Sequence, residues 1–284
     1  MTRSLTVLDP GPLTTVQDRG RRGLAHLGVP RSGALDARAA GYANRLVGNA
    51  EEAAVLETTL GGVSVRVDSP AAVAVTGAPA AVTLDGRPVS FAEPVRVRAG
   101  QTLVVGPAAH GLRSYLAVSG GIAVEPVLGS RSTDTLSGLG PPRLSAGSRL
   151  PLGEPAGDPH GVDVAVVLGH PDTVRLRLVP GPRLDWFAED VLARLTGEDY
   201  TVSPHSNRIG LRLAGETLDR RHDAELPSEG LVLGAVQVPA SGQPLVFLND
   251  HPTTGGYPVV GVVVAGDLPA CAQLRPGAAV RFVV

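Results

Sequence analysis

The sequence predicts a mainly β protein with a few short helices, folded as two β-barrels that pack into one unit. From residue 63 onward, short apolar runs follow one another, and turns rich in glycine and proline separate them. Strands at this spacing, with few helices, are typical of antiparallel barrels and sandwiches. A turn that combines a small residue with glycine and leads into an apolar strand recurs at residues 98–101, 145–148 and 275–278. Because the second copy closes the first half and the third closes the chain, we expect two barrels.

The same patterns give the expected order of elements. A strand at 5–8 comes first, and a helix follows at 37–47 with Asp36 at its N-cap position. A second short helix is expected at 51–58, followed by strands at 63–67, 72–75, 81–84, 95–98, 102–105 and 114–118. The second half should contain a helix at 185–195 and strands near 174–179, 208–213, 245–248 and 259–264. The predicted domains are a first barrel at 1–153, a proline- and glycine-rich linker at 154–171, and a second barrel at 172–284.

Composition and charge exclude several classes of partner. A formal net charge of -2 over 284 residues gives no electrostatic reason to bind nucleic acid or an anionic membrane. Aromatic residues make up 3% of the chain, which disfavours base-stacking surfaces. Cys271 is the single cysteine, so no disulfide forms within the chain. The sequence shows neither a signal-peptide pattern nor an apolar run of roughly 18 residues, and we expect a cytoplasmic protein.

All 25 basic residues are arginine, and this absence of lysine limits the chemistry. It excludes a phosphate loop of the G-x-x-x-x-G-K-[ST] type, a lysine Schiff base and a biotinyl-lysine on this chain. Any bound anion must therefore be held by arginine, hydroxyl groups or backbone amides. The seven histidines do not pair at metal-ligand spacing, so we expect no metal site.

Two polar loops, one near each end of the chain, are the candidate functional segments. Residues 249–258 lie between two apolar runs and contain a carboxylate, two threonines and paired glycines, which allow positive φ and close approach of a ligand. Residues 14–23 combine three arginines with a glutamine and an aspartate, a set suited to a carboxylate or phosphate. The alternative for each loop is an ordinary solvated turn. Similarly, Arg208 and Arg212 either serve an anion or lie on a solvated strand face.

A series of motifs runs in one order across almost the whole chain and resembles a known family. They include Thr14-Thr-Val-Gln-Asp-Arg-Gly-Arg, Ser32-Gly-Ala-Leu-Asp, Ala43-Asn-Arg-Leu-Val-Gly-Asn, Val118-Ser-Gly-Gly-Ile, Arg208-Ile-Gly-Leu-Arg-Leu and Thr253-Thr-Gly-Gly-Tyr-Pro. The chain is similar to the family called allophanate hydrolase subunit 2, biotin-dependent carboxyltransferase subdomain, KipA-like protein or the C component of bacterial 5-oxoprolinase. It departs from the family pattern at Asn207, His251, Pro252 and the segment 137–143.

The resemblance implies two cyclophilin-like β-barrels and a subunit of a multi-component hydrolase. The implied activity is 5-oxoprolinase, which opens 5-oxo-L-proline to L-glutamate with ATP bound at a site completed by a partner. The implied partners are an allophanate hydrolase subunit 1-like (KipI-like) protein and a LamB/YcsF-like third component. One alternative is biotin-dependent carboxyl transfer in a urea or allophanate pathway, with biotin on another chain. Another is a non-catalytic regulator that binds its subunit 1-like partner.

We assign expected roles to the polar residues on this basis. The expected catalytic residues are Asp18, Asp250, Thr253 and Thr254. The expected substrate-binding residues are Gln17, Arg19, Arg22, Ser32, Asn207, Arg208, Gln237, Gly255, Gly256 and Tyr257. The threonines and glycine amides would orient a phosphate, and the loop near residue 17 would hold the substrate carboxylate. We expect both loops to form one crevice that the partner completes.

Overall fold

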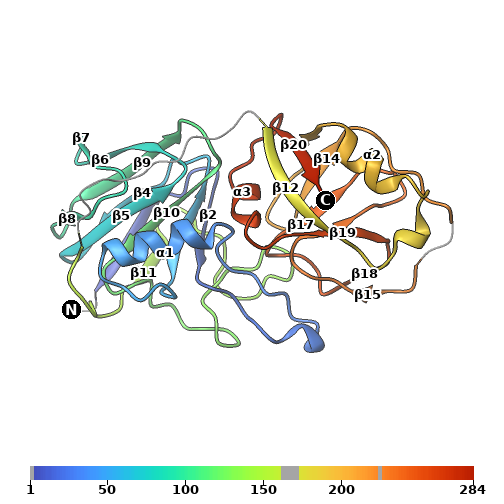
Figure 1. Cartoon of the computed structure of the whole chain (residues 1–284). Coiled ribbons are helices and arrows are strands. Elements are labelled where there is room, and N and C mark those ends of the chain that lie inside the picture. The colour runs from blue at the N-terminus through green and yellow to red at the C-terminus, as the bar shows by residue number, and fades with distance from the viewer. Residues whose placement is uncertain (1–2, 161–172, 223–225) are drawn as a thin grey trace. The chain divides into compact units, whose positions relative to one another are not determined.

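The computed structural model describes residues 3–160, 173–222 and 226–284, and the chain divides into two compact units (Figure 1). The N-terminal unit consists of Met1–Arg21, Ser32–Asp134 and Gly138–Gly169. The C-terminal unit consists of Arg22–Arg31, Thr135–Ser137 and His170–Val284. Most of the predicted linker, residues 161–171, lies outside the described residues. The predicted domain boundaries therefore stay a prediction.

In the N-terminal unit, two open antiparallel sheets enclose an apolar core. The strands of the first sheet are, in order, β11 (Arg149–Pro151), β1 (Ser4–Asp9), β4 (Ser64–Val67), β9 (Thr102–Ala108), β6 (Ala80–Leu84) and β7 (Arg87–Val89). Those of the second are β2 (Leu13–Gln17), β3 (Val55–Thr59), β10 (Arg113–Val118), β5 (Ala71–Gly77) and β8 (Val95–Val97). The structure does not show the closed barrel that was expected in this half of the chain. The edge strands β7, β8 and β11 are short, and no described strand of one sheet pairs with the other.

Strand β10 shows how the residues of this unit divide between two layers. Leu116 and Val118 point into the core between the sheets, whereas Tyr115 and Ala117 pack on the opposite face. Helix α1 (Ala37–Leu46) covers that second face with its alanines and Leu46. Both faces of β10 are buried, so its sequence lacks the polar alternation of a surface strand.

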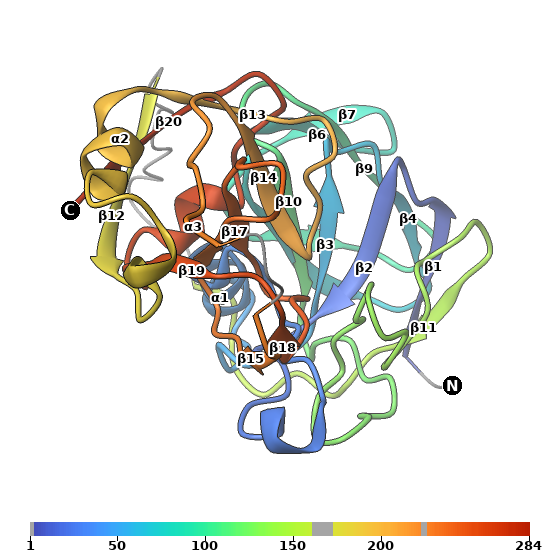
Figure 2. The same ribbon diagram turned by 90° about the vertical axis from the view of Figure 1, so that its right-hand side faces the viewer.

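The C-terminal unit contains a closed barrel of seven strands. Their order is β12 (Thr173–Pro180), β19 (Val259–Val263), β16 (Ala235–Gln237), β17 (Leu245–Phe247), β14 (Gly210–Ala214), β13 (Tyr200–Val202) and β20 (Ala279–Val283). Strands β12 and β20 close the barrel as a parallel pair. Along β12, Val174, Leu176 and Leu178 are buried while Arg175 and Arg177 are exposed, the alternation of a barrel wall. A two-stranded ribbon, β15 (Glu229–Gly230) with β18 (Thr254–Gly255), lies beside the barrel in both views (Figures 1 and 2).

Most predicted strands are confirmed, but two predicted helices need correction. The helix after Asp36 is confirmed, and the Asp36 carboxylate accepts a hydrogen bond from the Ala39 amide at 3.0 Å. The helix expected at 51–58 is wrong: Val55–Thr59 forms β3, because pairing with β2 and β10 outweighs local helix preference. The helix expected at 185–195 is split into a 3₁₀ turn, η2 (Leu184–Trp186), and α2 (Val191–Gly197). Phe187 separates them because its backbone is extended.

The predicted recurrence of a small-residue–glycine turn is confirmed. In each copy the backbone amide of the fourth residue donates a hydrogen bond to the carbonyl oxygen of the first. The pairs are Gln101 to Arg98 at 3.2 Å, Ser148 to Ser145 at 3.0 Å, and Ala278 to Arg275 at 3.0 Å. The third residue of each copy is a glycine with φ of 85°, 85° or 88°, as a type II turn requires. Strands β9, β11 and β20 follow directly. The remaining described helices are η1 (Ala25–Leu27) and α3 (Leu268–Cys271), and no described helix is long and apolar enough to cross a membrane.

A substitution at Gly261 on β19 tests how tightly the barrel is packed. A Cβ atom there would lie 2.5 Å from Leu178 Cγ inside the barrel, whereas a Cβ at Gly230 would meet nothing within 4 Å. We expect Gly261→Ala to lower the free energy of unfolding by about 1–3 kcal/mol through overpacking. Gly230→Ala should change it by less than about 1 kcal/mol. Urea unfolding followed by the fluorescence of Trp186, the single tryptophan, measures both, and equal effects would contradict this packing.

Because of Tyr200, we expect the stability of the barrel to fall at alkaline pH. Burial, with a smaller contribution from the Glu216 carboxylate, raises the pKa of Tyr200 to about 12. Its hydroxyl has no hydrogen-bond partner among the described residues. Because the unfolded tyrosine ionises near pH 10, stability is fully present below that pH and falls as the pH rises towards 12. Tyr200→Phe should remove part of this fall, measured as the urea midpoint at pH 8 and pH 11. A pH dependence identical to that of the unsubstituted protein would contradict the assignment.

Candidate functional site

In the N-terminal unit, the carboxylate of Asp18 organises the loop at residues 130–132. Its Oδ1 atom accepts hydrogen bonds from the Ser130 hydroxyl at 2.6 Å and the Ser132 hydroxyl at 2.5 Å. The Gly20 amide also donates to Oδ1, at 2.8 Å, and the Arg131 amide donates to Oδ2 at 2.6 Å. Hydrogen bonds to an ionised carboxylate are among the stronger ones in proteins. Asp18 therefore acts as a scaffold for this loop, while the catalytic role expected for it stays a prediction.

A buried arginine that was not among the expected site residues continues this network. Arg21 is 2% exposed and donates to the carbonyl oxygens of Val127 at 2.9 Å and Ser132 at 2.6 Å. It also donates to the Ser32 hydroxyl at 3.1 Å, and Ser32 in turn donates to the Asp134 carboxylate at 2.7 Å. Ser32 is fully buried and has a left-handed backbone with φ of 53°. Its hydroxyl is thus committed to neighbouring side chains.

The expected substrate ligands Gln17 and Arg19 have different surroundings. Gln17 is fully buried, and its Nε2 atom donates to the Thr15 hydroxyl and the Thr133 carbonyl oxygen, both at 3.0 Å. Arg19 is exposed and pairs with Glu51 at 2.8 Å and Glu52 at 3.0 Å. The Arg19 guanidinium is thus already paired with carboxylates of the chain itself. The role expected for each residue stays a prediction.

In the C-terminal unit, Asp250 forms a fully buried ion pair with Arg208. Arg208 Nη2 donates to Asp250 Oδ1 at 2.9 Å, and Arg208 Nε donates to Oδ2 at 3.0 Å. Oδ2 also accepts from the Thr135 amide at 2.9 Å and the Thr135 hydroxyl at 2.7 Å. Because four donors already surround this carboxylate, it holds the segment at Thr135 against the barrel. The sequence predicted both charged residues as site residues but gave no sign that they pair with each other.

The loop that carries the threonines is exposed and pairs with β15. Thr254 is exposed, and neither its hydroxyl nor that of Thr253 makes a hydrogen bond to the described residues. Neither Gly255 nor Gly256 uses the positive φ that glycine allows. Close packing leaves little room for a side chain at either position. A Cβ at Gly255 would lie 2.8 Å from Gln237 Nε2, and one at Gly256 would lie 3.2 Å from a backbone carbonyl oxygen. The loop therefore presents hydroxyl groups on a closely packed ribbon.

Three further expected ligands mainly support the structure around this loop. Gln237 is buried and donates from Nε2 to the Tyr257 carbonyl oxygen at 3.0 Å. The Tyr257 ring is 40% exposed, and the guanidinium of Arg220 lies over it at 5.9 Å. Asn207 accepts from the amide of Ile209 at 2.8 Å, as in a local Asx turn. These contacts order the loop and leave the Tyr257 ring accessible.

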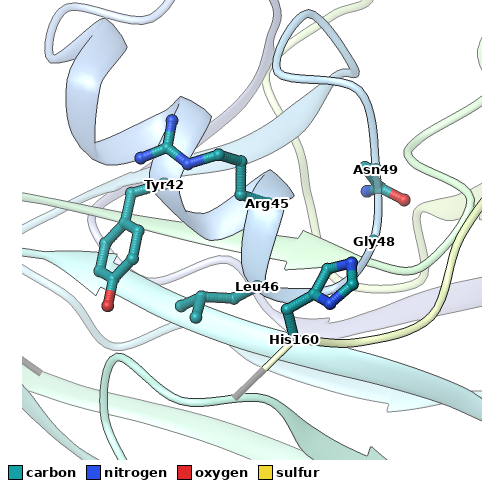
Figure 3. Close-up of a pocket in the computed structure, with 6 residues that line it drawn as sticks. All are labelled: Tyr42, Arg45, Leu46, Gly48, Asn49 and His160. Atoms are coloured by element: carbon teal, nitrogen blue, oxygen red, sulfur yellow. The ribbon is translucent and has the colours of Figure 1, made fainter. Parts of the chain in front are cut away.

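The N-terminal unit contains a pocket with a volume of about 420 Å³ (Figure 3). Its lining residues are Tyr42, Arg45, Leu46, Gly48, Asn49 and His160. Arg45 bonds to Glu51 at 2.5 Å and lies over the Tyr42 ring at 5.7 Å. The Asn49 amide donates to Asn44 and Val118 and accepts from Gly120. None of the expected site residues lines this pocket, and the side chains of Arg45 and Asn49 serve the surrounding structure.

Sequence patterns did not predict two features of these networks. The hydroxyl-rich segment 130–137 was visible, but nothing in its spacing showed that Ser130, Ser132 and Thr135 would bind carboxylates. Arg21 was one of three neighbouring arginines, and an irregular loop has no periodicity that distinguishes a buried arginine from an exposed one.

Comparison with known proteins places the chain in a family. The family model "Carboxyltransferase domain, subdomain A and B" matches residues 27–284. The chain is 41% identical to the C component of the 5-oxoprolinase of Escherichia coli, over 98% of this chain and 90% of that protein. It is 34% identical to the C component of the 5-oxoprolinase of Haemophilus influenzae, with the same coverage of both chains.

A larger enzyme shares the same fold. The crystal structure of the K. lactis urea amidolyase superposes on all of this chain with a TM-score of 0.93 and 30% sequence identity. This chain spans 19% of that protein. The similarity therefore concerns one portion of a larger enzyme.

The ion pair of Asp250 provides a test of its structural role. Asp250→Asn leaves the buried Arg208 without its counter-charge, and we expect the free energy of unfolding to fall by about 3–5 kcal/mol. Asp219→Asn, which alters a 73% exposed carboxylate paired with Arg194, should cost less than about 1 kcal/mol. Urea unfolding followed by Trp186 fluorescence measures both. Unchanged stability of Asp250→Asn, together with lost activity of the assembled enzyme, would instead assign Asp250 to the chemistry.

Proposed function

Since this chain belongs to the family of carboxyltransferase domains, subdomains A and B, we propose that it is a subunit of an ATP-dependent 5-oxoprolinase. The observation that carries the proposal is 41% identity to the C component of a 5-oxoprolinase over 98% of this chain and 90% of that protein. Similarity that spans both chains almost completely favours the same role over a shared fold alone. The family that the sequence motifs indicate is thereby confirmed.

The chemistry that such an enzyme must perform explains the need for ATP. A lactam carbonyl is a poor electrophile. In the proposed reaction, the lactam oxygen attacks the γ-phosphorus of ATP and ADP leaves. Water then adds to the activated carbon, the ring C–N bond breaks, and the nitrogen takes up a proton. A second water releases phosphate from the resulting acyl phosphate to give the open-chain carboxylate.

In this reaction the chain would contribute hydrogen-bond donors rather than a basic carboxylate. The exposed hydroxyl of Thr254 and the neighbouring hydroxyl of Thr253 make no hydrogen bond to described residues. They are therefore available to a phosphate or to the developing charge on the lactam oxygen. The carboxylates of Asp18 and Asp250 already accept four hydrogen bonds each. We propose positioning roles for these two residues.

We further propose that partner proteins complete the ATP site. The chain has no lysine, which many phosphate sites use as a point charge. The partners implied by the family resemblance are a subunit 1-like protein and a LamB/YcsF-like component. The expected location of such an assembly is the cytoplasm, where its nucleotide is made.

A reconstitution experiment tests this function. ATP hydrolysis is measured with 5-oxo-L-proline for this chain alone, for the partners alone and for the mixture. We expect hydrolysis that depends on 5-oxo-L-proline only in the mixture. Hydrolysis by the partners alone at the rate of the mixture would contradict the proposal.

Within the mixture, Thr254→Val tests the proposed donor. Removing one donor to a developing negative charge should lower kcat about 100-fold while the Tm stays unchanged, because the side chain is exposed. Thr201→Val, on the exposed face of β13, is the matched control and should leave kcat unchanged. Equal activity of the two variants would contradict a role for the Thr254 hydroxyl.

Carboxyl transfer is the second candidate function, and the structural similarity to urea amidolyase supports it. Biotin would be carried by another chain, because this chain offers no lysine for its attachment. Inhibition of the assembled enzyme by avidin would favour this function. Full activity in the presence of avidin would favour 5-oxoprolinase.

A further inference from the structure

Arg22 and Arg31 of the C-terminal unit are two cations without an acidic partner in the described part of the chain. Among the residues that the structure describes, no carboxylate lies within ion-pair distance of either guanidinium. Many other arginines of the chain do have such a partner: Arg19, Arg45, Arg66, Arg113, Arg149, Arg177, Arg183, Arg194, Arg208, Arg221 and Arg281. Within the described residues, the lack of an acidic partner is shared with other arginines, such as Arg175, so it is the surroundings of Arg31 that distinguish this pair.

The surroundings of Arg31 make the lack of an anion costly. Its Nε atom is buried and has no hydrogen-bond partner in the described part of the chain. Burial, followed by the positive charge of Arg22, lowers the pKa of Arg31. A partly desolvated cation beside a second cation is electrostatically unfavourable. An anion that contacted both groups would relieve both effects.

The backbone between the two arginines forms a closed loop. The Leu27 and Gly28 amides donate to the carbonyl oxygens of Leu24 and Ala25, both at 2.9 Å, and the Val29 amide donates to Leu24 at 3.3 Å. Because the loop carries its own hydrogen bonds, its ends are held close together. Arg22 and Arg31 flank this loop, and the positive charge of Arg22 acts on the guanidinium of Arg31.

The position of this loop is consistent with access to a ligand. Arg22 is exposed and Arg31 is half-buried, so their terminal nitrogens can meet a group that arrives from solvent. The segment 22–31, drawn in blue, lies on the side of the barrel that carries the β15–β18 ribbon in both views (Figures 1 and 2). Thr254 lies on that ribbon.

We propose that Arg22 and Arg31 together bind an anionic oxygen group, either a carboxylate or a phosphate. The planar guanidinium presents paired donors that match both groups. The proposal deepens the proposed function and rests on it for the choice of ligands, which are the carboxylate of 5-oxoproline and the phosphates of ATP. Arg31 was not an expected site residue, whereas Arg22 was expected to hold the substrate carboxylate.

Direct binding tests the site without requiring activity. The thermal unfolding of this chain is followed by Trp186 fluorescence with 5-oxo-L-proline, with inorganic phosphate, or with 2-pyrrolidinone, which has the lactam but no carboxylate. The variants are Arg22→Gln, Arg31→Gln and, as a control of equal charge, Arg175→Gln on the exposed face of β12. We expect at least one anion to raise the Tm of the unsubstituted chain and of Arg175→Gln, because a ligand that binds the folded state stabilises it.

The outcomes decide between an anion site and solvated arginines. We expect the anion-induced rise in Tm to be lost in Arg22→Gln and in Arg31→Gln, and 2-pyrrolidinone to have no effect on any variant. Stabilisation by 5-oxo-L-proline assigns the site to the carboxylate, and stabilisation by phosphate alone assigns it to a phosphoryl group. Equal stabilisation of all variants, or of none, would overturn the proposal.

Kinetics of the assembled enzyme separate this inference from the proposed function. If the carboxylate binds here, Arg31→Gln should raise the KM for 5-oxo-L-proline at least 10-fold and leave the KM for ATP unchanged. If a phosphate binds here, the KM for ATP should rise instead. An active assembly in which Arg31→Gln behaves like Arg175→Gln would overturn the anion site alone. An inactive assembly with intact anion binding would count against the proposed function alone.

Discussion

The buried pairing of Asp250 with Arg208 and Thr135 is the interaction on which the C-terminal unit depends. Burying two charges is costly, and this cost is offset only when the geometry is good and the remaining hydrogen-bonding positions are filled. Here the arginine binds both carboxylate oxygens and threonine supplies two more donors. In the N-terminal unit, Asp18 has the same role for residues 130–132. Each unit thus fixes a polar loop around one saturated carboxylate.

This arrangement separates groups that maintain the structure from groups that remain available to ligands. A carboxylate surrounded by four donors is poorly placed to remove a proton from substrate. The available groups are the hydroxyls of Thr253 and Thr254, the ring of Tyr257, and the guanidinium groups of Arg22 and Arg31. Hydroxyls and arginines stabilise negative charge, which is what phosphoryl transfer and lactam opening require. The chain therefore suits charge stabilisation within a multi-component enzyme.

Sequence patterns predicted the mainly β fold, the helix after Asp36 and the three glycine turns, because each depends on local geometry. They failed where long-range pairing decides the outcome. Residues 51–58 have helical composition, yet Val55–Thr59 pairs with β2 and β10 as a strand. Whether a sheet closes into a barrel depends on its edge strands. At the candidate site, residue types identified two loops rich in polar side chains. They did not reveal that Arg19 pairs with glutamates or that Arg31 has no acidic partner among the described residues, because both facts depend on three-dimensional neighbours.

Amide hydrogen exchange measured by NMR tests the scaffold role of the carboxylates most directly. We expect slow exchange at the amides of Arg131 and Thr135, which donate to Asp18 and Asp250. The exchange should become much faster at Arg131 in Asp18→Asn and at Thr135 in Asp250→Asn, with each effect centred on its own loop. Rapid exchange of these amides in the unsubstituted protein would contradict the account, because the carboxylates would then not hold the loops.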